Sequence, residues 1–303
     1  MMSAPTLLVL AAGLGSRYGG IKQMDPVGPD GEFVLDYSIY DAWRAGFRQV
    51  CLVIRDELRE PLREHFATKL TGKMSLDFVV QRLDDLPTGF SCPPERQKPW
   101  GTGHAIWTAR KAIRGPFAAI NADDFYGAES YQVLADFMCS PQRTASSYAM
   151  VAYKLANTLS EHGSVSRGIC RKDERGELLS VVERTKIEKT ATGARYLDGD
   201  GQWQALTGEE PVSLNLWGFM PGIFDHLEVL FREFLQARGH EAKSEFYIPT
   251  VVDTLIQRGQ CRTAVLESSE RWFGMTYAED RAVVVDQIRA LTAAGRYPAP
   301  LWG

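Results

Sequence analysis

Apolar runs alternate with segments of helical periodicity along the first half of the chain. Short apolar runs predict buried strands at residues 6–12, 49–54, 76–80 and 116–121. Apolar residues at helical spacing predict helices between them, at residues 35–46, 58–70 and 105–113. This alternation predicts a parallel sheet with helices on both faces, and ligands of such sheets bind at the carboxyl ends of the strands.

The second half has a different pattern. The runs at 164–170 and 177–183 flank a turn, Asp173-Glu174-Arg175-Gly176, and predict a hairpin. Further strands are predicted at 147–154 and 212–219, and helices at 221–239, 248–257 and 279–294. The polar stretches at 82–101 and 184–210 are predicted to be long loops.

Together these elements predict an α/β fold with a three-layer core. Its sheet is expected to be mixed and mostly parallel, and the second half is expected to be an α+β elaboration of the same sheet. The chain is therefore predicted to be a single domain of residues 1–303, made of two halves at 1–140 and 141–303.

Composition narrows the class of protein. The chain has 303 residues, 45% hydrophobic and 24% charged, as in an ordinary globular protein. A formal net charge of −4 argues against a nucleic-acid-binding surface. The five cysteines are scattered and form no Cys-x-x-Cys pair, which favours a cytoplasmic location and argues against a zinc site. No signal peptide is expected, because the N-terminal residues 1–5 lack a basic segment and the apolar stretch after them is short. No membrane span is expected, because no apolar run approaches the roughly 20 residues that a span needs.

The most informative segment follows the first predicted strand. Residues 10–23 contain four glycines together with Arg17 and Lys22. Glycines let backbone N–H groups approach an anion closely, and the two basic side chains add positive charge. The segment is therefore predicted to bind a polyphosphate.

Two common phosphate-binding motifs do not fit this segment. A dinucleotide-binding fingerprint requires a third glycine where this chain has Tyr18. A Walker motif requires Lys and then Ser or Thr after its second glycine, whereas Ile21 and Lys22 follow Gly20. The pattern that remains is Gly13-x-Gly15-Ser16-Arg17-x4-Lys22.

Two further motifs and one glutamine lie at the ends of predicted strands or before a predicted helix. The backbone of Gly101-Thr102-Gly103 is suited to hydrogen-bonding a nucleobase, and the alternative is a helix cap at Thr102. The neighbouring His104 fits a structural role as well as a catalytic one. Asp123 is placed as a carboxylate that binds Mg²⁺, and Asp124 either orients a substrate or caps a turn. Gln81 ends the third strand and is a candidate to contact the base.

The pattern at 10–23 resembles the opening loop of the sugar-nucleotide pyrophosphorylases, which are nucleotidyltransferases with a Rossmann-like core. The segments at 101–105 and 121–127 resemble that family's nucleobase and metal motifs, and the segment 243–249 resembles one near its sugar pocket. The resemblance covers most of the chain. It implies that a nucleoside triphosphate reacts with a sugar 1-phosphate in a Mg²⁺-dependent reaction that releases pyrophosphate, with no nucleic acid or membrane as partner.

The resemblance also implies roles for individual residues. Arg17 and Lys22 would be catalytic, and Asp123 would bind the metal. Nucleotide binding, in the half 1–140, is implied for Leu10, Ala11, Ala12, Gly13, Gly15, Ser16, Gln81, Gly101, Thr102 and Gly103. Sugar or acceptor binding, mostly in the half 141–303, is implied for Asp124, Gly163, Glu183, Lys186 and Asn215. Arg184 is the alternative to Lys186 for the sugar phosphate.

The sequence departs from the family pattern at the second metal ligand. The family has an Asp or Asn near positions 274–276, where this chain has Gly274, Met275 and Thr276. Thr276, a water molecule or Asp280 would take that place, unless the protein supplies only one carboxylate. Two other functions stay open: a cytidylyltransferase-type enzyme with a non-sugar phosphorylated acceptor, and a non-catalytic nucleotide-binding regulatory protein.

Overall fold

Parallel strands form the centre of the first half. The structure, a computed structural model, describes residues 4–13, 22–160, 163–275 and 277–303. β1 (Thr6–Leu10) lies between β2 (Gln49–Ile54) and β4 (Phe117–Asn121), and β3 (Ser75–Val80) follows β2 at the edge of the sheet. These pairs are all parallel, so the carboxyl ends of these strands lie together along one side of the sheet.

The second half extends the same sheet, mainly through antiparallel pairs. The order continues from β4 through β11 (Pro211–Phe219), β7 (Val165–Lys172), β8 (Leu178–Thr190) and β9 (Gly193–Leu197) to β10 (Trp203–Leu206). β6 (Ser147–Lys154) pairs with β11 and with β12 (Arg262–Glu267). A separate short pair joins β5 (Asp124–Phe125) to β13 (Phe273–Gly274). The predicted α/β fold with a mixed sheet is confirmed. The expectation that the sheet is mostly parallel is wrong, because parallel pairing is confined to β1–β4 and to β6 with β12, and the other pairs of the sheet are antiparallel.

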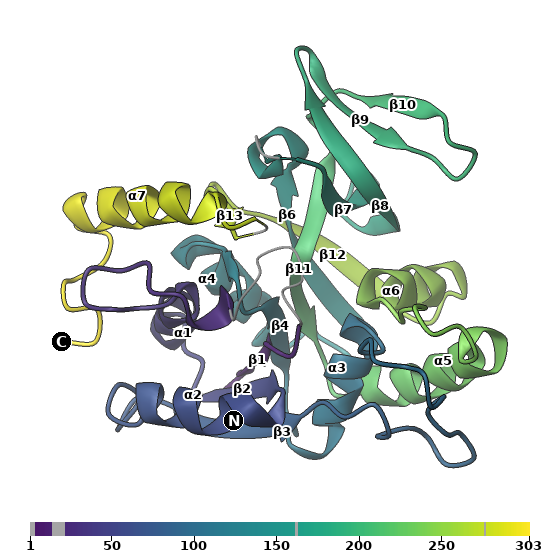
Figure 1. Ribbon diagram of the computed structural model, residues 1–303, viewed down its shortest axis with the longest axis horizontal. Coiled ribbons are helices and arrows are strands. Elements are labelled where there is room, and N and C mark those ends of the chain that lie inside the picture. Colours follow the sequence, from purple (N-terminus) through teal and green to yellow (C-terminus); the bar gives the residue numbers. More distant parts are fainter. Residues whose placement is uncertain (1–3, 14–21, 161–162, 276) are drawn as a thin grey trace.

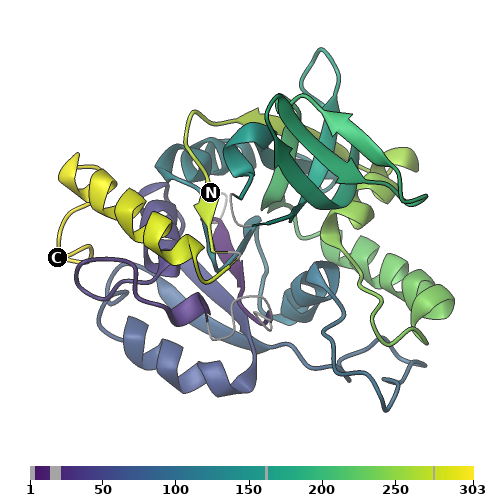
Figure 2. The same ribbon diagram turned by 45° about the horizontal axis from the view of Figure 1, so that its top comes forward.

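Helices cover both faces of the sheet (Figure 1, Figure 2). On one side lie α1 (Val34–Arg44), α2 (Arg59–Phe66), α4 (Ala128–Met138) and α7 (Asp280–Ala293). On the other side lie α3 (Thr102–Thr108), α5 (Ile223–Arg238) and α6 (Ile248–Gln257). Short 3-10 turns are η1 (Lys22–Met24), η2 (Asp56–Leu58), η3 (Ala109–Lys111) and η4 (Leu155–Thr158). Among the described residues, no helix is both long enough and apolar enough to cross a bilayer.

β11 changes its partner halfway along its length. Residues 212–213 pair with β7, whereas residues 217–219 pair with β4. The pairing of β11 with β6 is interrupted between Ser213 and Trp217. Asn215 lies in this bulge with a φ of 62°, a conformation that Asn tolerates better than most residues. The bulge therefore explains why a polar residue interrupts an apolar strand.

Several predicted boundaries agree with the structure, and one predicted loop is wrong. The strands at 49–54 and 147–154 and the helix at 248–257 have their predicted bounds, and residues 82–101 contain no strand or helix. The predicted loop at 184–210 is instead the end of β8 followed by β9 and β10. Many side chains in these strands are exposed, so no apolar alternation marks them.

α4 and β12 lie in stretches for which the sequence predicted no element. α4 buries Tyr131, Leu134 and Met138, which are three and four residues apart. This helical spacing is the signal that could have revealed α4. β12 is a short strand between polar segments, and its parallel pairing with β6 joins residues more than a hundred positions apart.

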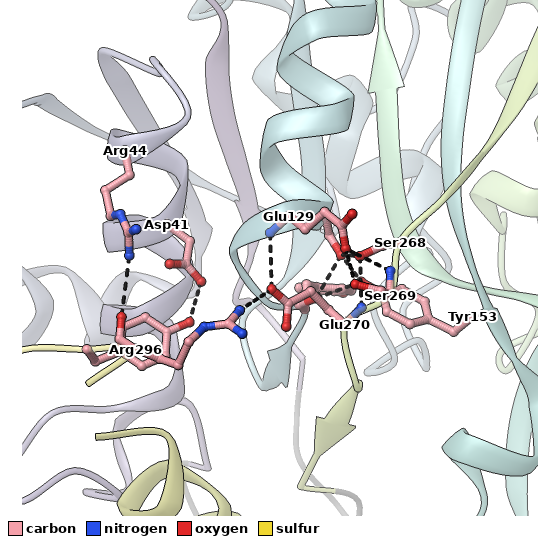
Figure 3. Close-up of polar contacts among 11 residues, drawn as sticks. Asp41, Arg44, Glu129, Tyr153, Ser268, Ser269, Glu270 and Arg296 are labelled. Carbon is pink, nitrogen blue, oxygen red and sulfur yellow. Dashed lines mark hydrogen bonds and ion pairs between the residues drawn. The ribbon is translucent and has the colours of Figure 1, made fainter. Parts of the chain in front are cut away.

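Polar contacts fix the segment between β12 and β13 to the helices behind it (Figure 3). The Glu129 carboxylate, in the first turn of α4, accepts hydrogen bonds from the Ser269 N–H (2.8 Å) and hydroxyl (2.5 Å). Arg296 Nη2 lies 2.5 Å from Glu270 Oε1, and the Arg296 carbonyl accepts a hydrogen bond from Arg44 on α1 (3.5 Å). These contacts help to hold β13 against β5, which begins at Asp124.

Asp41 is a buried acid whose charge opposes folding near neutral pH. It accepts a hydrogen bond from the Tyr297 hydroxyl (2.6 Å), and its Oδ1 has no hydrogen-bond partner among the described residues. Burial raises the pKa of Asp41 to about 7, although the Tyr297 hydrogen bond and the Arg44 charge oppose the rise. The folded protein therefore keeps a proton that the unfolded chain loses near pH 4. This group's contribution to stability falls as the pH rises from about 4 to 7.

We expect Asp41→Asn to stabilise the protein at pH 8 by about 1–3 kcal/mol, because the amide accepts the Tyr297 hydrogen bond without a buried charge. At pH 5, where Asp41 is already neutral, we expect little effect. Urea unfolding at both pH values measures the difference. Asp136→Asn, on the exposed side of α4, is the control. A loss of stability at pH 8 would contradict this account.

Candidate active site

The predicted phosphate-binding loop begins and ends beside the carboxyl end of β1. Gln23 Nε2 donates hydrogen bonds to the carbonyl oxygens of Ala11 (3.4 Å) and Gly13 (3.1 Å), and the Gln23 side chain is buried. The Ala11 N–H donates to the Val53 carbonyl (2.8 Å), which ties the start of the loop to β2. Gln23 therefore holds the two ends of the loop together.

Part of this loop lies outside the described residues. The predicted residues Gly15, Ser16 and Arg17 are among those that the structure does not describe. Lys22 begins η1, and its backbone is described but its side chain is not. Their roles stay predictions.

Gly101-Thr102-Gly103 starts α3 and packs against the segment before α6. The Gly103 N–H donates to the Phe246 carbonyl (2.8 Å). Gly101 has a φ of 103°, and a Cβ there would lie 2.7 Å from the Phe246 carbonyl oxygen, so this close approach requires glycine. The Thr102 hydroxyl accepts a hydrogen bond from the Ile248 N–H (3.0 Å). Thr102 therefore caps α6, while Gly101 is the N-cap residue of its own helix.

Gln81 and His104 lie beside this corner. Gln81 directly follows β3, and its Nε2 lies 3.5 Å from the Gly101 carbonyl oxygen and 2.9 Å from His104 Nδ1. The structure thus brings together two residues predicted to bind the base. His104 is fully buried, and burial lowers its pKa to about 4, so the imidazole is neutral near pH 7.

Asp123 and Asp124 follow β4 and have different surroundings. Asn121 Nδ2 donates to Asp124 Oδ2 (2.9 Å), and the Tyr126 hydroxyl lies 3.2 Å from the same oxygen. That hydroxyl also donates to the Leu214 carbonyl (2.8 Å), which connects Asp124 with the strand that carries Asn215. Asp124 is buried and Asp123 is partly exposed, so Asp123 is the more accessible of the two to a ligand.

The segment where the family has its second metal ligand lies directly beside these carboxylates. Gly274 pairs with Asp124 across β13 and β5, and the Met275 N–H donates to the Asp123 carbonyl (3.3 Å). A Cβ at Gly274 would lie 2.4 Å from Asp124 Oδ1. A side chain at position 274 therefore fits only if Asp124 moves.

The other candidates for the second ligand have different places. Met275 is buried in a hydrophobic cluster behind β5. Asp280 accepts a hydrogen bond from the Tyr277 N–H (2.8 Å) at the start of α7. Thr276 lies outside the described residues.

The donor set fits a metal that is held partly by substrate. The described residues contain no group of three His, Cys, Asp or Glu side chains that could hold a metal ion. Mg²⁺ is commonly bound by one or two carboxylates together with substrate phosphates and water. An accessible Asp123 near the ends of the predicted phosphate-binding loop fits this mode of binding.

A second cluster of charged side chains comes from β8, which carries Glu183, and from the segment before α6, which carries Glu245. Burial raises the pKa of Glu183 to about 7; Glu245 adds to the rise and Arg167 opposes it. Glu245 accepts a hydrogen bond from the Tyr247 hydroxyl (2.5 Å) and lies 2.6 Å from Lys98 Nζ. Because Glu245 precedes Phe246, the packing of Phe246 on Gly101 also brings this group near the predicted base-binding corner.

The remaining predicted acceptor residues lie on irregular backbone. Lys186, with a φ of 54°, and Asn215 are the non-glycine residues of positive φ in the described chain. Such conformations are rare and are found disproportionately at functional sites. Lys186 is exposed at a bulge between β7 and β8, and Asn215 Oδ1 accepts a hydrogen bond from the Trp217 indole (3.4 Å). A Cβ at Gly163 would lie 2.7 Å from the Tyr277 hydroxyl.

Two residues of the site had no role in the sequence-based prediction. Gln23 is part of the Gly-rich segment, but only its contacts show that it joins the loop ends. Lys98 lies in the long 82–101 loop, where nothing local indicates its ion pair with Glu245.

Comparison with known proteins agrees with this fold. No protein-family model matches the chain. The UTP–glucose-1-phosphate uridylyltransferase 1 of Staphylococcus saprophyticus is 26% identical over 248 residues, which cover 75% of this chain and 76% of that protein. A UDP-glucose pyrophosphorylase solved with UDP-glucose has a TM-score of 0.63 at 17% identity, over 95% of this chain and 99% of that one. The inositol-1-phosphate CTP transferase from T. maritima also has a TM-score of 0.63, at 10% identity, over 95% of this chain and 98% of that one.

These similarities confirm the resemblance that the sequence motifs indicated. The fold is that of the nucleotidyltransferases. Over three quarters of its length the chain is also similar in sequence to a sugar-1-phosphate nucleotidyltransferase, the staphylococcal uridylyltransferase.

Proposed function

We propose that the protein transfers a nucleoside monophosphate from a nucleoside triphosphate to a sugar 1-phosphate and releases pyrophosphate, with Mg²⁺ as cofactor. One observation carries the proposal: the ends of the Gly-rich loop, Gln81 with Gly101, and Asp123 all lie at the carboxyl ends of β1, β3 and β4. Ligands of open α/β sheets bind at this edge. The substrates in the relative's name, UTP and glucose 1-phosphate, are the pair that we propose first.

The proposed reaction depends on positioning and charge neutralisation. The attacking group is a phosphate oxygen of the sugar 1-phosphate, which is already anionic, so no general base is needed to remove a proton. This oxygen bonds to the α-phosphorus as the bond to pyrophosphate breaks in line. Positive charges and N–H groups around the phosphates lower the barrier because negative charge moves onto the leaving group.

Each part of the site receives a role in this proposal. Arg17 and the backbone of 13–16 would hold the β- and γ-phosphates, and Lys22 would contact the α-phosphate. Asp123 would hold Mg²⁺, which neutralises phosphate charge when bound. Gln81 and the corner at 101–103 would bind the base.

The acceptor side is assigned in the same way. Glu183 would accept hydrogen bonds from sugar hydroxyls, and Lys186 would contact the sugar phosphate. Asp124, Gly163 and Asn215 would shape the acceptor pocket. In this proposal residues 1–140 bind the nucleotide, and residues 141–303 bind most of the acceptor.

A pyrophosphate-release assay tests the proposal. UTP, dTTP, CTP, GTP and ATP are each combined with glucose 1-phosphate, other sugar 1-phosphates, inositol 1-phosphate and phosphocholine in the presence of Mg²⁺. We expect release with UTP and glucose 1-phosphate. Release only with inositol 1-phosphate or phosphocholine would favour a non-sugar acceptor. If no pair of substrates releases pyrophosphate, the proposal is contradicted.

Glu183 predicts a pH dependence of acceptor binding. Because its pKa is about 7, we expect the KM for glucose 1-phosphate to fall by about tenfold between pH 6 and pH 8, as a carboxylate accepts hydroxyl hydrogen bonds more strongly than a carboxylic acid. Glu183→Gln is the control. Its side chain does not ionise, so any change of its KM between pH 6 and pH 8 comes from titration of the substrate's own phosphate. An equal pH dependence in both proteins would contradict this role.

A further inference from the structure

His104 lies beside Gln81 in a place where both of its ring nitrogens have partners. His104 Nε2 lies 2.9 Å from the Asp85 carbonyl oxygen, and His104 Nδ1 lies 2.9 Å from Gln81 Nε2. The ring is fully buried and packs against Trp107 and Phe231, with centroids 6.0 and 5.2 Å away. This packing restricts rotation of the imidazole.

These partners determine where the imidazole proton lies. A backbone carbonyl oxygen can only accept a hydrogen bond, so Nε2 must carry a proton. Burial lowers the pKa of His104 to about 4, so near pH 7 the ring has a single proton and Nδ1 is an acceptor. The group of Gln81 that faces Nδ1 must therefore be its amide nitrogen and not its carbonyl oxygen.

The contact with Gly101 points to the same orientation. A glutamine amide has nearly the same shape when it is turned by half a rotation, so only its hydrogen bonds define its direction. Gln81 Nε2 faces two acceptors, His104 Nδ1 and, at 3.5 Å, the Gly101 carbonyl. Gln81 Oε1 accepts no hydrogen bond from the described residues, and Gln81 is partly exposed. Its carbonyl oxygen is therefore the group available to a ligand.

We propose that His104 is a positioning residue that holds the Gln81 carbonyl oxygen toward the nucleobase, so that the site selects bases with a ring N–H. This inference rests on the proposed function. Uracil and thymine carry an N–H between two carbonyl groups and can donate to Gln81 Oε1. The corresponding ring nitrogen of cytosine is an acceptor. It would face Gln81 Oε1, which is also an acceptor, so no hydrogen bond forms and both atoms stay unsatisfied.

Calorimetric titration with UTP and CTP tests this selection. We expect the wild-type protein to bind UTP at least tenfold more tightly than CTP. In His104→Leu the Gln81 amide can turn and present its NH₂ group, so the ratio of the two affinities should fall toward one. His104→Gln can accept from Gln81 and donate to the Asp85 carbonyl, so it should restore the preference.

A matched control separates this effect from general loosening of α3. The Thr108 hydroxyl donates to the His104 backbone carbonyl (2.8 Å) and is buried on the same helix. Thr108→Val removes that hydrogen bond but leaves both partners of the imidazole in place. We expect the ratio of UTP to CTP affinity to be unchanged in this variant.

Nitrogen NMR of the His104 ring tests the orientation without a ligand. We expect the proton on Nε2 and none on Nδ1, and the reverse would overturn the inference. If His104→Leu does not fold, Gln81→Glu provides a second test. Its carboxylate offers only acceptors, so this variant should keep the preference for UTP while its His104 becomes protonated at Nδ1. A preference for CTP in Gln81→Glu would overturn the inference.

The possible results distinguish this inference from the proposed function. Equal affinities for UTP and CTP in the wild-type protein, or an unchanged ratio in folded His104→Leu, would overturn the inference while pyrophosphate release could still support the proposed function. Selective binding of UTP without pyrophosphate release from any acceptor would contradict the proposed function and leave the role of His104 supported.

Discussion

Replacing Lys22 with alanine is expected to lower kcat for pyrophosphate release by a factor of about 10² to 10³. A unit positive charge about 4 Å from a phosphate charge contributes roughly 4 kcal/mol at an effective dielectric constant near 20, before desolvation. Each 1.36 kcal/mol changes a rate about tenfold. If the alanine variant loses most of this stabilisation in the transition state, kcat falls by the expected factor. The rate is measured with saturating UTP, glucose 1-phosphate and Mg²⁺.

A matched substitution makes the Lys22 result specific. Lys111 is an exposed lysine on η3, so Lys111→Ala removes the same charge away from the loop and should leave kcat unchanged. Thermal unfolding of both variants shows whether the fold is kept. A folded Lys22→Ala protein with normal kcat would remove Lys22 from the proposed mechanism.

Asp123→Asn is expected to lower the rate by about 10² to 10³ and to raise the Mg²⁺ concentration needed for half-maximal activity. Bound Mg²⁺ contributes several kcal/mol of charge stabilisation, and an amide is a weaker ligand than a carboxylate. The effect should be large because Gly274 offers no side chain beside Asp124 and Met275 is buried. Initial rates over a series of Mg²⁺ concentrations measure both quantities.

Asp200→Asn is the control for Asp123→Asn, because Asp200 is exposed in the turn between β9 and β10. It should change neither the rate nor the Mg²⁺ dependence. An Asp123→Asn protein with the wild-type Mg²⁺ dependence would show that the metal is bound without this carboxylate.

The parts of the fold that could be predicted are those with a strong local pattern. The strand at 49–54 is buried along its length, and the helix at 248–257 has a regular apolar face, so their boundaries followed from periodicity. The second half of β8 and the whole of β9 and β10 were missed because their side chains alternate weakly and many are exposed. Their strand conformation depends on pairing with one another, which local propensity does not encode.

The candidate site was predicted unevenly for similar reasons. Gln81, Gly101 and Asp123 follow strands or precede a helix, so their grouping at one edge could be expected from the order of elements. The predicted alternative, a helix cap at Thr102 for its own helix, is wrong: Gly101 is the N-cap of α3, and the Thr102 hydroxyl instead accepts a hydrogen bond from the first N–H of α6. His104 was ambiguous because its proton position depends on the Asp85 carbonyl, a contact within an irregular loop.

The sequence by itself determined the class of fold, the edge of the sheet at which ligand binding is predicted and the chemical type of the groups there. Such features depend on residue types at short spacing, and short spacing is readable without a structure. Only the tertiary structure decided that Gln23 joins the loop ends, that Asp124 excludes a side chain at Gly274, and that His104 orients Gln81. These relations depend on contacts of a few ångströms between side chains and separate backbone segments, and no local pattern specifies such contacts.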